Sequence, residues 1–252
     1  MSKQLVSRLS GLYLGDKQDN HDGVSTTINQ KRPAKQLIVT HERIQGNGEA
    51  DPKHHGGFDR VIHHFPREHY GQYRRWDLIS GVRDAPTMGE NISTVGVNEA
   101  QVNIGDIVRF GDVVLQVTQP RSPCFKLNLQ FNQPQFALAM QETALCGWFY
   151  KVIEAGTIDK SDSMELIERR SDISLAEAMR IYFLPQFDAN QYQRLLDSDG
   201  LAQSWVNSLQ NRLDMGSIEP WDMRLYGPQG KPKLDSVLVK TITNYQLPAH
   251  DH

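Results

Sequence analysis

The run Asp106-Ile-Val-Arg-Phe-Gly-Asp-Val-Val-Leu-Gln-Val-Thr118 indicates the fold class, because apolar and β-branched residues fill it on both sides of a single Gly-Asp pair. This pattern predicts two β-strands joined by a tight turn. We expect the second strand to stop at Pro120, since proline has no N–H to donate to a sheet ladder. A second proline follows at Pro123, so the chain leaves a strand, makes a stiff turn and presents Cys124.

Cys124 stands between two basic residues, Arg121 and Lys126. A neighbouring positive charge favours the thiolate, which is the form of cysteine that attacks electrophiles and binds metals. The alternative is a buried, inert cysteine, but a proline turn at the end of a strand is a poor place to hide a thiol. We therefore predict that Cys124 is reactive and that Cys146, beside an aromatic run, only packs in the core.

The composition is that of an ordinary globular protein: 252 residues, 38% hydrophobic and 23% charged, with a formal net charge of −3. This near-neutral balance argues against a nucleic-acid partner, which requires an excess of lysine and arginine. No apolar run has the length of a membrane span, and the first residues do not resemble a signal peptide. Two cysteines do not make a disulfide framework. The sequence predicts a cytoplasmic protein that binds neither nucleic acid nor membrane.

Short strand-like runs separated by irregular loops dominate the first 170 residues. This arrangement is typical of a closed β-barrel, so the predicted fold class is mainly β. Besides the two strands before the proline turn, strands are predicted at residues 4–14, 36–41, 61–65, 147–153 and 163–168, with short helices at 67–77 and 133–141.

Helical periodicity replaces the strand pattern after Arg170. Ser174 with Glu177 three residues later forms a capping box before an amphipathic run. Three helices are predicted, and their core is too small to be stable alone, so we expect the module to dock on the barrel. The helices are predicted at residues 174–183, 189–196 and 201–213. The chain thus divides into a barrel (1–170), a three-helix module (171–216) and a C-terminal extension (217–252), with a further strand predicted at 236–241.

Histidine and arginine concentrate in the segment before the third predicted strand and after it. Five of the nine histidines fall within sixteen residues, and several arginines are interleaved with them. A zinc site usually shows a tight ligand spacing on defined elements, which this cluster lacks. Arginine and histidine also bind phosphate oxyanions, so we favour an anion site over a metal held by histidines. The histidines are His54, His55, His63, His64 and His69, and the arginines are Arg60, Arg67, Arg74 and Arg75.

Three motifs in this order resemble the MOSC domain family, the C-terminal type of molybdenum-cofactor sulfurases. They are His54-His-Gly-Gly-Phe-Asp-Arg60, Gly89-Glu-Asn91 and the Pro120-Arg-Ser-Pro-Cys124 turn. A barrel followed by three helices resembles the YiiM-like branch of this family, over roughly residues 1–215. The resemblance implies a closed MOSC-type β-barrel and a bound molybdenum cofactor, a molybdopterin whose phosphate needs cationic partners.

The resemblance also implies the roles of individual residues. Cys124 would ligate the metal or receive sulfur. His55 would be the catalytic proton donor, since its usual pKa lies near neutrality. The cofactor-binding residues that the resemblance implies are Lys31, Arg60, Arg67, Glu90, Asn91 and Arg121. One departure from the family pattern occurs at Gly46-Asn47-Gly48-Glu49, where the family usually has Gly-Asp, so Asn47 is given no role.

The function implied is the reduction of N-hydroxylated small molecules, such as hydroxylaminopurine-type base analogues, to amines as detoxification. Electrons would come from a separate reductase, because the chain has no glycine-rich dinucleotide fingerprint. Two alternatives stay open: a sulfur carrier that uses a Cys124 persulfide, and a non-catalytic module that binds phosphate or pterin. Pyridoxal phosphate is an alternative phosphate-bearing cofactor, and a homodimer is not decided by the sequence.

Overall fold

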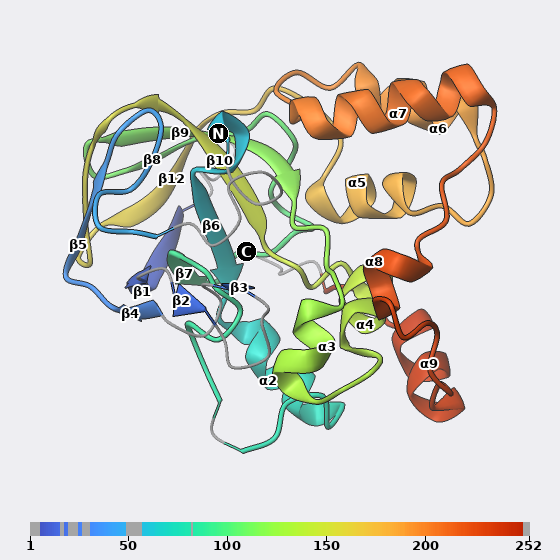
Figure 1. Cartoon of the computed structure of the whole chain (residues 1–252). Helices are drawn as coiled ribbons and strands as arrows, with labels where there is room; N and C mark the ends of the chain where they lie inside the picture. The colour runs from blue at the N-terminus through green and yellow to red at the C-terminus, as the bar shows by residue number, and fades with distance from the viewer. Residues whose placement is uncertain are drawn as a thin grey trace.

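The computed structural model describes residues 6–15, 18–19, 25–26, 31–48, 57–81 and 83–248. Its centre is a closed barrel of seven strands, with helices packed on one side and around one end (Figure 1). The predicted fold class is therefore confirmed. The barrel strands are β1 (Val6–Gly15), β6 (Ile62–Pro66), β7 (Ile92–Val95), β8 (Ile107–Phe110), β9 (Val113–Pro120), β10 (Trp148–Glu154) and β12 (Ser163–Glu168).

The barrel closes because β1 pairs with strands from both ends of the strand order. The circular order is β1, β12, β8, β9, β10, β6, β7 and back to β1. Neighbours are antiparallel except β6 and β7, which run parallel. Short additional strands flank the barrel: β4 (Lys31–Pro33) pairs with the end of β1, β5 (Gln36–Val39) pairs with β11 (Gly156–Asp159), and β2 (Gln18–Asp19) pairs with β3 (Ser25–Thr26).

The two strands predicted before the proline turn are β8 and β9, joined at Gly111-Asp112. All eight residues of β9 are buried. A strand with one wet face alternates between apolar and polar residues, whereas a strand covered on both faces has a continuous apolar run. Helix α5 packs on β9 and accounts for the covered outer face.

The three-helix module packs on the barrel, as its small core led us to expect. It consists of α5 (Leu175–Tyr182), α6 (Ala189–Leu196) and α7 (Gln203–Met215). The Ser174 hydroxyl accepts the N–H of Glu177, which is the predicted cap. The backbone N–H of Ala202 donates to the carbonyl of Thr118 in β9 at 3.0 Å. The Trp205 ring stacks on Tyr182, with centroids 3.9 Å apart, and joins α7 to α5.

The C-terminal extension is helical, and the strand predicted at 236–241 is wrong. That segment is α9 (Ser236–Thr243), whose first N–H groups are capped by the Asp235 carboxylate. β-branched residues favour a strand only where a sheet edge accepts them. Here a side-chain cap and burial of Ile242 favour a helix, which packs against α4 (Phe136–Thr143).

Three further helices complete the part of the chain that the structure describes. The helix predicted at 67–77 is α2 (Glu68–Arg75), while α3 (Lys126–Phe131) and α8 (Asp222–Tyr226) were not predicted. A single 3-10 turn, η1, spans Phe58–Arg60. Across the described ranges, no helix has both the length and the apolar character that a bilayer span requires.

Removal of the helices should expose the buried outer face of β9. We predict that a chain ending at Arg170 is recovered mainly as aggregate, because the buried strand β9 loses the helix α5 that packs on it. Soluble yield and thermal unfolding measure this. A chain ending at Pro248, which keeps every described helix, is the control. A soluble, cooperatively unfolding 1–170 fragment would contradict the docking.

Candidate functional site

The turn that carries Cys124 leaves the end of β9 and leads into α3. The N–H of Arg121 donates to the carbonyl of Gly147 at 2.9 Å, and the N–H of Leu127 donates to the carbonyl of Cys124 at 3.0 Å. Cys124 is partly exposed, whereas Cys146 is fully buried. Burial raises the pKa of the Cys146 thiol well above its usual value. Cys146 is a packing residue as predicted, and Cys124 is the thiol that a reagent can reach.

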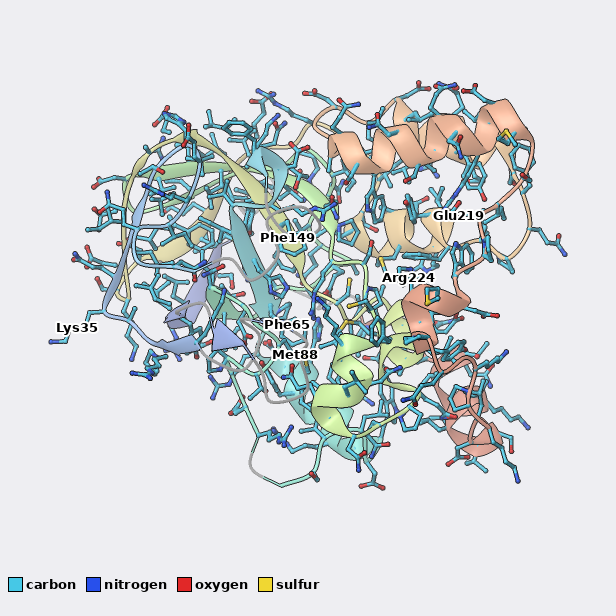
Figure 2. All side chains as sticks on the ribbon, in the orientation of Figure 1. Lys35, Phe65, Met88, Phe149, Glu219 and Arg224 are labelled. Atoms are coloured by element: carbon cyan, nitrogen blue, oxygen red, sulfur yellow. The ribbon has the colours of Figure 1, made fainter. Side chains whose placement is uncertain are left out.

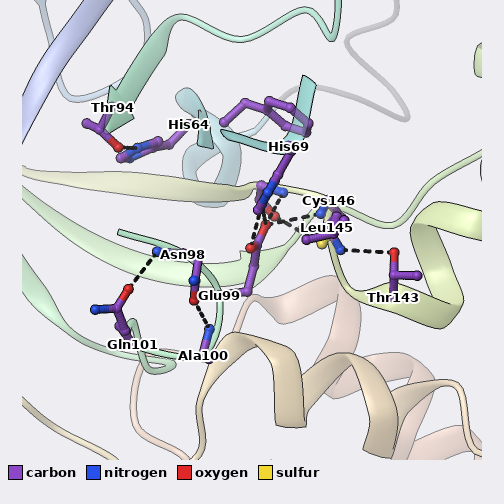
Figure 3. A network of polar contacts seen from close by, with 12 residues as sticks. His64, His69, Thr94, Asn98, Glu99, Ala100, Gln101, Thr143, Leu145 and Cys146 are labelled. Atoms are coloured by element: carbon purple, nitrogen blue, oxygen red, sulfur yellow. Dashed lines mark hydrogen bonds and ion pairs between the residues drawn. The ribbon is translucent and has the colours of Figure 1, made fainter. Parts of the chain in front are cut away.

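A buried carboxylate, Glu99, holds the loop to which the Cys124 turn is attached (Figure 3). It accepts hydrogen bonds from the N–H groups of Cys146 at 3.0 Å and Gly147 at 2.6 Å, and from Nε2 of His69 at 2.7 Å. Gly147 has a φ of 69°, and a Cβ there would lie 2.2 Å from the carbonyl oxygen of His64. Glycine is therefore required at position 147. Through its bonds to this loop, Glu99 positions the Gly147 carbonyl that accepts the N–H of Arg121.

Arg121 is a nearly buried cation beside the cysteine, 9% exposed. Its guanidinium lies 4.0 Å from the sulfur of Met140 and forms no ion pair with a carboxylate among the described residues. Burial lowers the pKa of Arg121, while the charges of Cys124, Cys146 and Glu90 act in the opposite direction. A buried charge without an opposite charge in contact is costly unless a ligand supplies one.

Glu90 lies within electrostatic reach of Arg121 and is fully buried. Its carboxyl group accepts from the hydroxyl of Tyr70 at 2.7 Å and from the N–H of Met88 at 3.1 Å. Burial raises the pKa of Glu90 to about 7, although the hydrogen bond from Tyr70 and the charge of Lys31 lower it. Glu90 can therefore hold or release a proton near neutral pH.

Lys31 is a second cation near the same carboxyl group. It begins β4, and the pairing of Lys31 with Gly15 at the end of β1 places it at the barrel. Desolvation lowers the pKa of Lys31 to about 7; the charge of Glu90 raises it and that of Arg121 lowers it. Arg121 thus lies within electrostatic reach of three other predicted site residues, Lys31, Glu90 and Cys124, and Lys31 also lies within reach of Glu90.

Asn91 supports this cluster through its amide. Its Nδ2 donates to the carbonyl of Tyr13 at 3.2 Å and to Oδ1 of Asn47 at 3.1 Å, and its Oδ1 accepts from the N–H of His63 at 3.3 Å. The side chain therefore joins β6 to β1 and to the glycine loop. Asn47, which received no role from the sequence, is the contact on that loop.

The other predicted arginines have partners within the protein. Arg60 donates to Oε1 of Gln119 at 3.3 Å and to the hydroxyl of Ser204 in α7 at 2.7 Å, so it faces the helical module. Arg67 pairs with Asp84 at 2.5 Å and is about one third exposed. These contacts lead to Gln119, to the helical module and to Asp84 rather than to Cys124. His54 and His55 lie outside the described residues.

His63 belongs to the histidine cluster noted in the sequence, where it was given no individual role, and the structure places it within electrostatic reach of Arg121. Its ring is 5% exposed, packs on Phe149 with centroids 4.9 Å apart, and has an Nε2 without a hydrogen-bond partner in the described ranges. Desolvation, and next the charge of Arg121, lower the pKa of His63 well below its usual value. An imidazole nitrogen without a partner in the described ranges therefore lies within electrostatic reach of Arg121 and Lys31. The pair His63-His64 inside the strand predicted at 61–65 was the signal available in the sequence.

The two other described histidines of the cluster, His64 and His69, pack in the interior. His64 contacts the hydroxyls of Tyr150 and Thr94, at 2.9 Å and 2.6 Å, and His69 contacts Glu99 (Figure 3). No group of three or more His, Cys, Asp or Glu side chains within the described ranges could hold a metal ion.

Comparison with known proteins gives the class to which this barrel and its cysteine turn belong. Residues 51–165 match the MOSC domain, and residues 173–216 match the YiiM-like, 3-alpha helix domain. The chain belongs to the MOSC domain family, in the branch that carries a YiiM-like helical domain. It is 40% identical over 217 residues to the protein YiiM of Escherichia coli (strain K12), covering 86% of this chain and 97% of the relative.

Two other comparisons extend this result. The crystal structure of YiiM from Escherichia coli superposes with a TM-score of 0.74 at 35% identity, covering 88% of this chain and 100% of that chain. A protein of Gibberella moniliformis named "Reductase" is 38% identical over 117 residues, which are 46% of this chain and 21% of that protein. The family recognised from the three motifs is therefore confirmed.

The raised pKa of Glu90 predicts how stability depends on pH. The Glu90 carboxyl group stays protonated up to about pH 7 in the folded protein, whereas in the unfolded chain it loses its proton near pH 4.5. The free energy of unfolding therefore falls as the pH rises through this interval. We expect the free energy of unfolding of Glu90→Gln to fall by about 2–3 kcal/mol less than that of the wild type over this interval. Urea unfolding at pH 5 and pH 7 measures it, with the exposed Glu165→Gln as control. Equal pH dependence in the wild type and Glu90→Gln would refute the assignment.

Proposed function

We propose that this protein binds the molybdenum cofactor and reduces N-hydroxylated small molecules, such as hydroxylaminopurine-type base analogues, to amines. The observation that carries the proposal is Arg121, a nearly buried guanidinium without an ion pair to a carboxylate in the described part of the chain, beside the partly exposed Cys124. MOSC domains are associated with molybdenum-cofactor binding in general. The fungal relative named "Reductase" supports oxidoreductase chemistry.

The residues present fit such a cofactor. A thiolate is a suitable soft ligand for the metal, and Arg121 with Lys31 would hold the phosphate. Lys31 would regain its proton when the phosphate binds, because an adjacent anion favours the charged form. The unpartnered Nε2 of His63 would form a hydrogen bond with the bound group. The bound cofactor would supply the two-electron chemistry that removes the hydroxyl oxygen.

The overall reaction consumes two electrons and two protons and releases the amine and water. His55 is the proposed proton donor, and Glu90, with a pKa of about 7, is a second group that can hold a proton there. A separate reductase is the proposed source of electrons. The cytoplasm, where such a donor and a small-molecule substrate would meet this protein, is the proposed location.

A sulfur carrier and a non-catalytic binding module are the competing functions. Protein purified from a host that makes the cofactor separates them. Molybdenum by elemental analysis, together with pterin fluorescence after oxidative release, supports the reductase. Cyanide-labile sulfur on Cys124 without metal supports the carrier, and phosphate binding with neither signal leaves the module.

Replacement of the thiol tests the role of Cys124. We predict that Cys124→Ser loses molybdenum and reductase activity while its thermal unfolding stays within a few degrees of the wild type, because a partly exposed turn residue contributes little packing. Ser122→Ala, in the same turn, is the matched control and should keep its metal. Loss of folding in Cys124→Ser would make the cysteine structural.

Replacement of Arg121 separates binding from stability. We predict that Arg121→Met lowers molybdenum content about tenfold or more, since a charged hydrogen bond contributes about 1.5–3 kcal/mol. The cofactor-free variant should be at least as stable as the wild type, because an apolar side chain replaces a buried charge without an ion pair. Elemental analysis and urea unfolding measure both effects, with the exposed Arg170→Met as control. A destabilised variant with normal metal content would overturn the assignment.

A further inference from the structure

We propose that Asp59 and Arg60 are positioning residues for Arg121: they join the first turn of α7 to the end of β9, where the cysteine turn begins. The two residues end the motif that starts at His54, and they lie in η1. The proposal rests on the proposed function only in taking Arg121 as a cofactor-binding residue. It gives the helical module a role, because the module then forms part of the scaffold of the site.

Helix α7 takes its N-terminal cap from the barrel. The helices α5 and α6 follow residues whose own side chains accept a backbone N–H, Ser174 and Asp188. The residue before α7 is Ala202, which has no such group. Instead, Oδ2 of Asp59 accepts the N–H of Gln203 at 2.8 Å. A side-chain acceptor at this position satisfies one of the N–H groups that the first turn of a helix leaves unpaired. The start of α7 therefore depends on a motif residue.

Arg60 and Gln119 connect the same turn of α7 to the cysteine turn. Nη2 of Arg60 donates to the hydroxyl of Ser204 at 2.7 Å, and its Nε donates to Oε1 of Gln119 at 3.3 Å. The Ser204 hydroxyl donates to the same Oε1 at 3.2 Å. Nε2 of Gln119 then donates at 3.3 Å to the carbonyl of Pro120, the residue before Arg121. One glutamine side chain thus joins the motif and α7 to the start of the cysteine turn.

The backbone of β9 is held at the adjacent residue, Thr118. Its carbonyl accepts the N–H of Ala202 at 3.0 Å, and its hydroxyl donates to the carbonyl of Asp59 at 2.6 Å. The same hydroxyl lies 3.1 Å from the carbonyl oxygen of Phe149 in β10, and Figure 2 shows Phe149 on the side of the barrel that faces the helices. The chain therefore enters the cysteine turn from a segment whose place is set by η1 and α7 together.

These hydrogen bonds add something that apolar packing does not supply. Helix α5 already attaches the module to the barrel by packing on β9. Apolar contacts are non-directional, whereas hydrogen bonds constrain both distance and angle. The residues of a binding site must be held within about 0.5 Å of their productive positions. Loss of the hydrogen bonds between η1, α7 and the end of β9 should therefore loosen Arg121 while the barrel stays folded.

Amide hydrogen exchange, followed by NMR in the full-length chain purified without cofactor, tests the proposal. The reporter is the N–H of Arg121, which donates to the carbonyl of Gly147. The reference is the N–H of Val117, which donates to the carbonyl of Asp106. The ratio of the two exchange rates separates a local opening of the turn from unfolding of the whole barrel.

The variants remove the contacts from either side. Asp59→Ala removes the cap of α7, Asp59→Asn keeps a capping side chain, and Ser204→Ala removes the hydroxyl on α7. Asp188→Ala is the matched control, since the same substitution removes the cap of α6, which does not contact η1 or the end of β9 through this cap.

We expect Asp59→Ala and Ser204→Ala each to raise the ratio of the Arg121 rate to the Val117 rate about three- to tenfold, because fewer contacts oppose a local opening. Asp59→Asn should stay within about twofold of the wild type, since asparagine caps a helix as well as aspartate does. Asp188→Ala should lower the Tm by about 2–4 °C and leave the ratio within about twofold of the wild type.

Three results would overturn the proposal. The first is an unchanged ratio in Asp59→Ala or in Ser204→Ala. The second is an equal rise in Asp188→Ala, which would show that a less stable module loosens Arg121 by itself. The third is a ratio in Asp59→Asn as high as that in Asp59→Ala. If Asp59→Ala does not fold by circular dichroism, Ser204→Ala against the wild type decides.

Metal content keeps this result apart from the proposed function. The absence of molybdenum from the wild-type protein, purified from a host that makes the cofactor, would refute the proposed function and leave the exchange result untouched. A normal molybdenum content in the wild type, together with unchanged exchange ratios in the variants, would refute the positioning role alone.

Discussion

The buried carboxylate of Glu99 is the contact on which the geometry of the site depends. It binds two successive backbone N–H groups, Cys146 and Gly147, and the carbonyl of Gly147 then receives the N–H of Arg121. The start of β10 and the end of β9 are therefore held together just where the cysteine turn begins. A buried carboxylate is tolerated there because three donors satisfy it, including Nε2 of His69.

The buried charges near the cysteine do not stabilise the protein in the absence of a ligand. Arg121 is nearly buried without an ion pair to a described carboxylate, and the pKa values of Lys31 and Glu90 both shift to about 7, in opposite directions from their usual values. Each shift means that the folded protein disfavours the charged form relative to the unfolded chain. Binding sites typically lower the free energy of unfolding in this way. An anionic ligand that binds the folded protein would restore part of it.

Patterns among residues that are close in sequence predicted the barrel and part of the candidate site. The continuous apolar run of β9 and the Ser174 cap indicated their elements directly, since both depend on neighbours in sequence. The helix α9 could not be predicted in this way, because its β-branched residues favour a strand until Ile242 is buried against α4. The contacts of Glu99 with His69 and of Arg60 with Ser204 join distant segments, and no spacing in the sequence reports them.

The extension shows how a distant segment becomes part of a site that local motifs define. The cysteine turn has proline on each side of Arg121, which limits its backbone but supplies few N–H groups for internal hydrogen bonds. The turn must therefore be held by contacts from other elements. Gly147 holds its start and Arg224 holds both peptide units that flank Cys124. The conformation of the turn thus depends both on its prolines and on Arg224, which lies beyond residue 216, where the match to the helical domain ends.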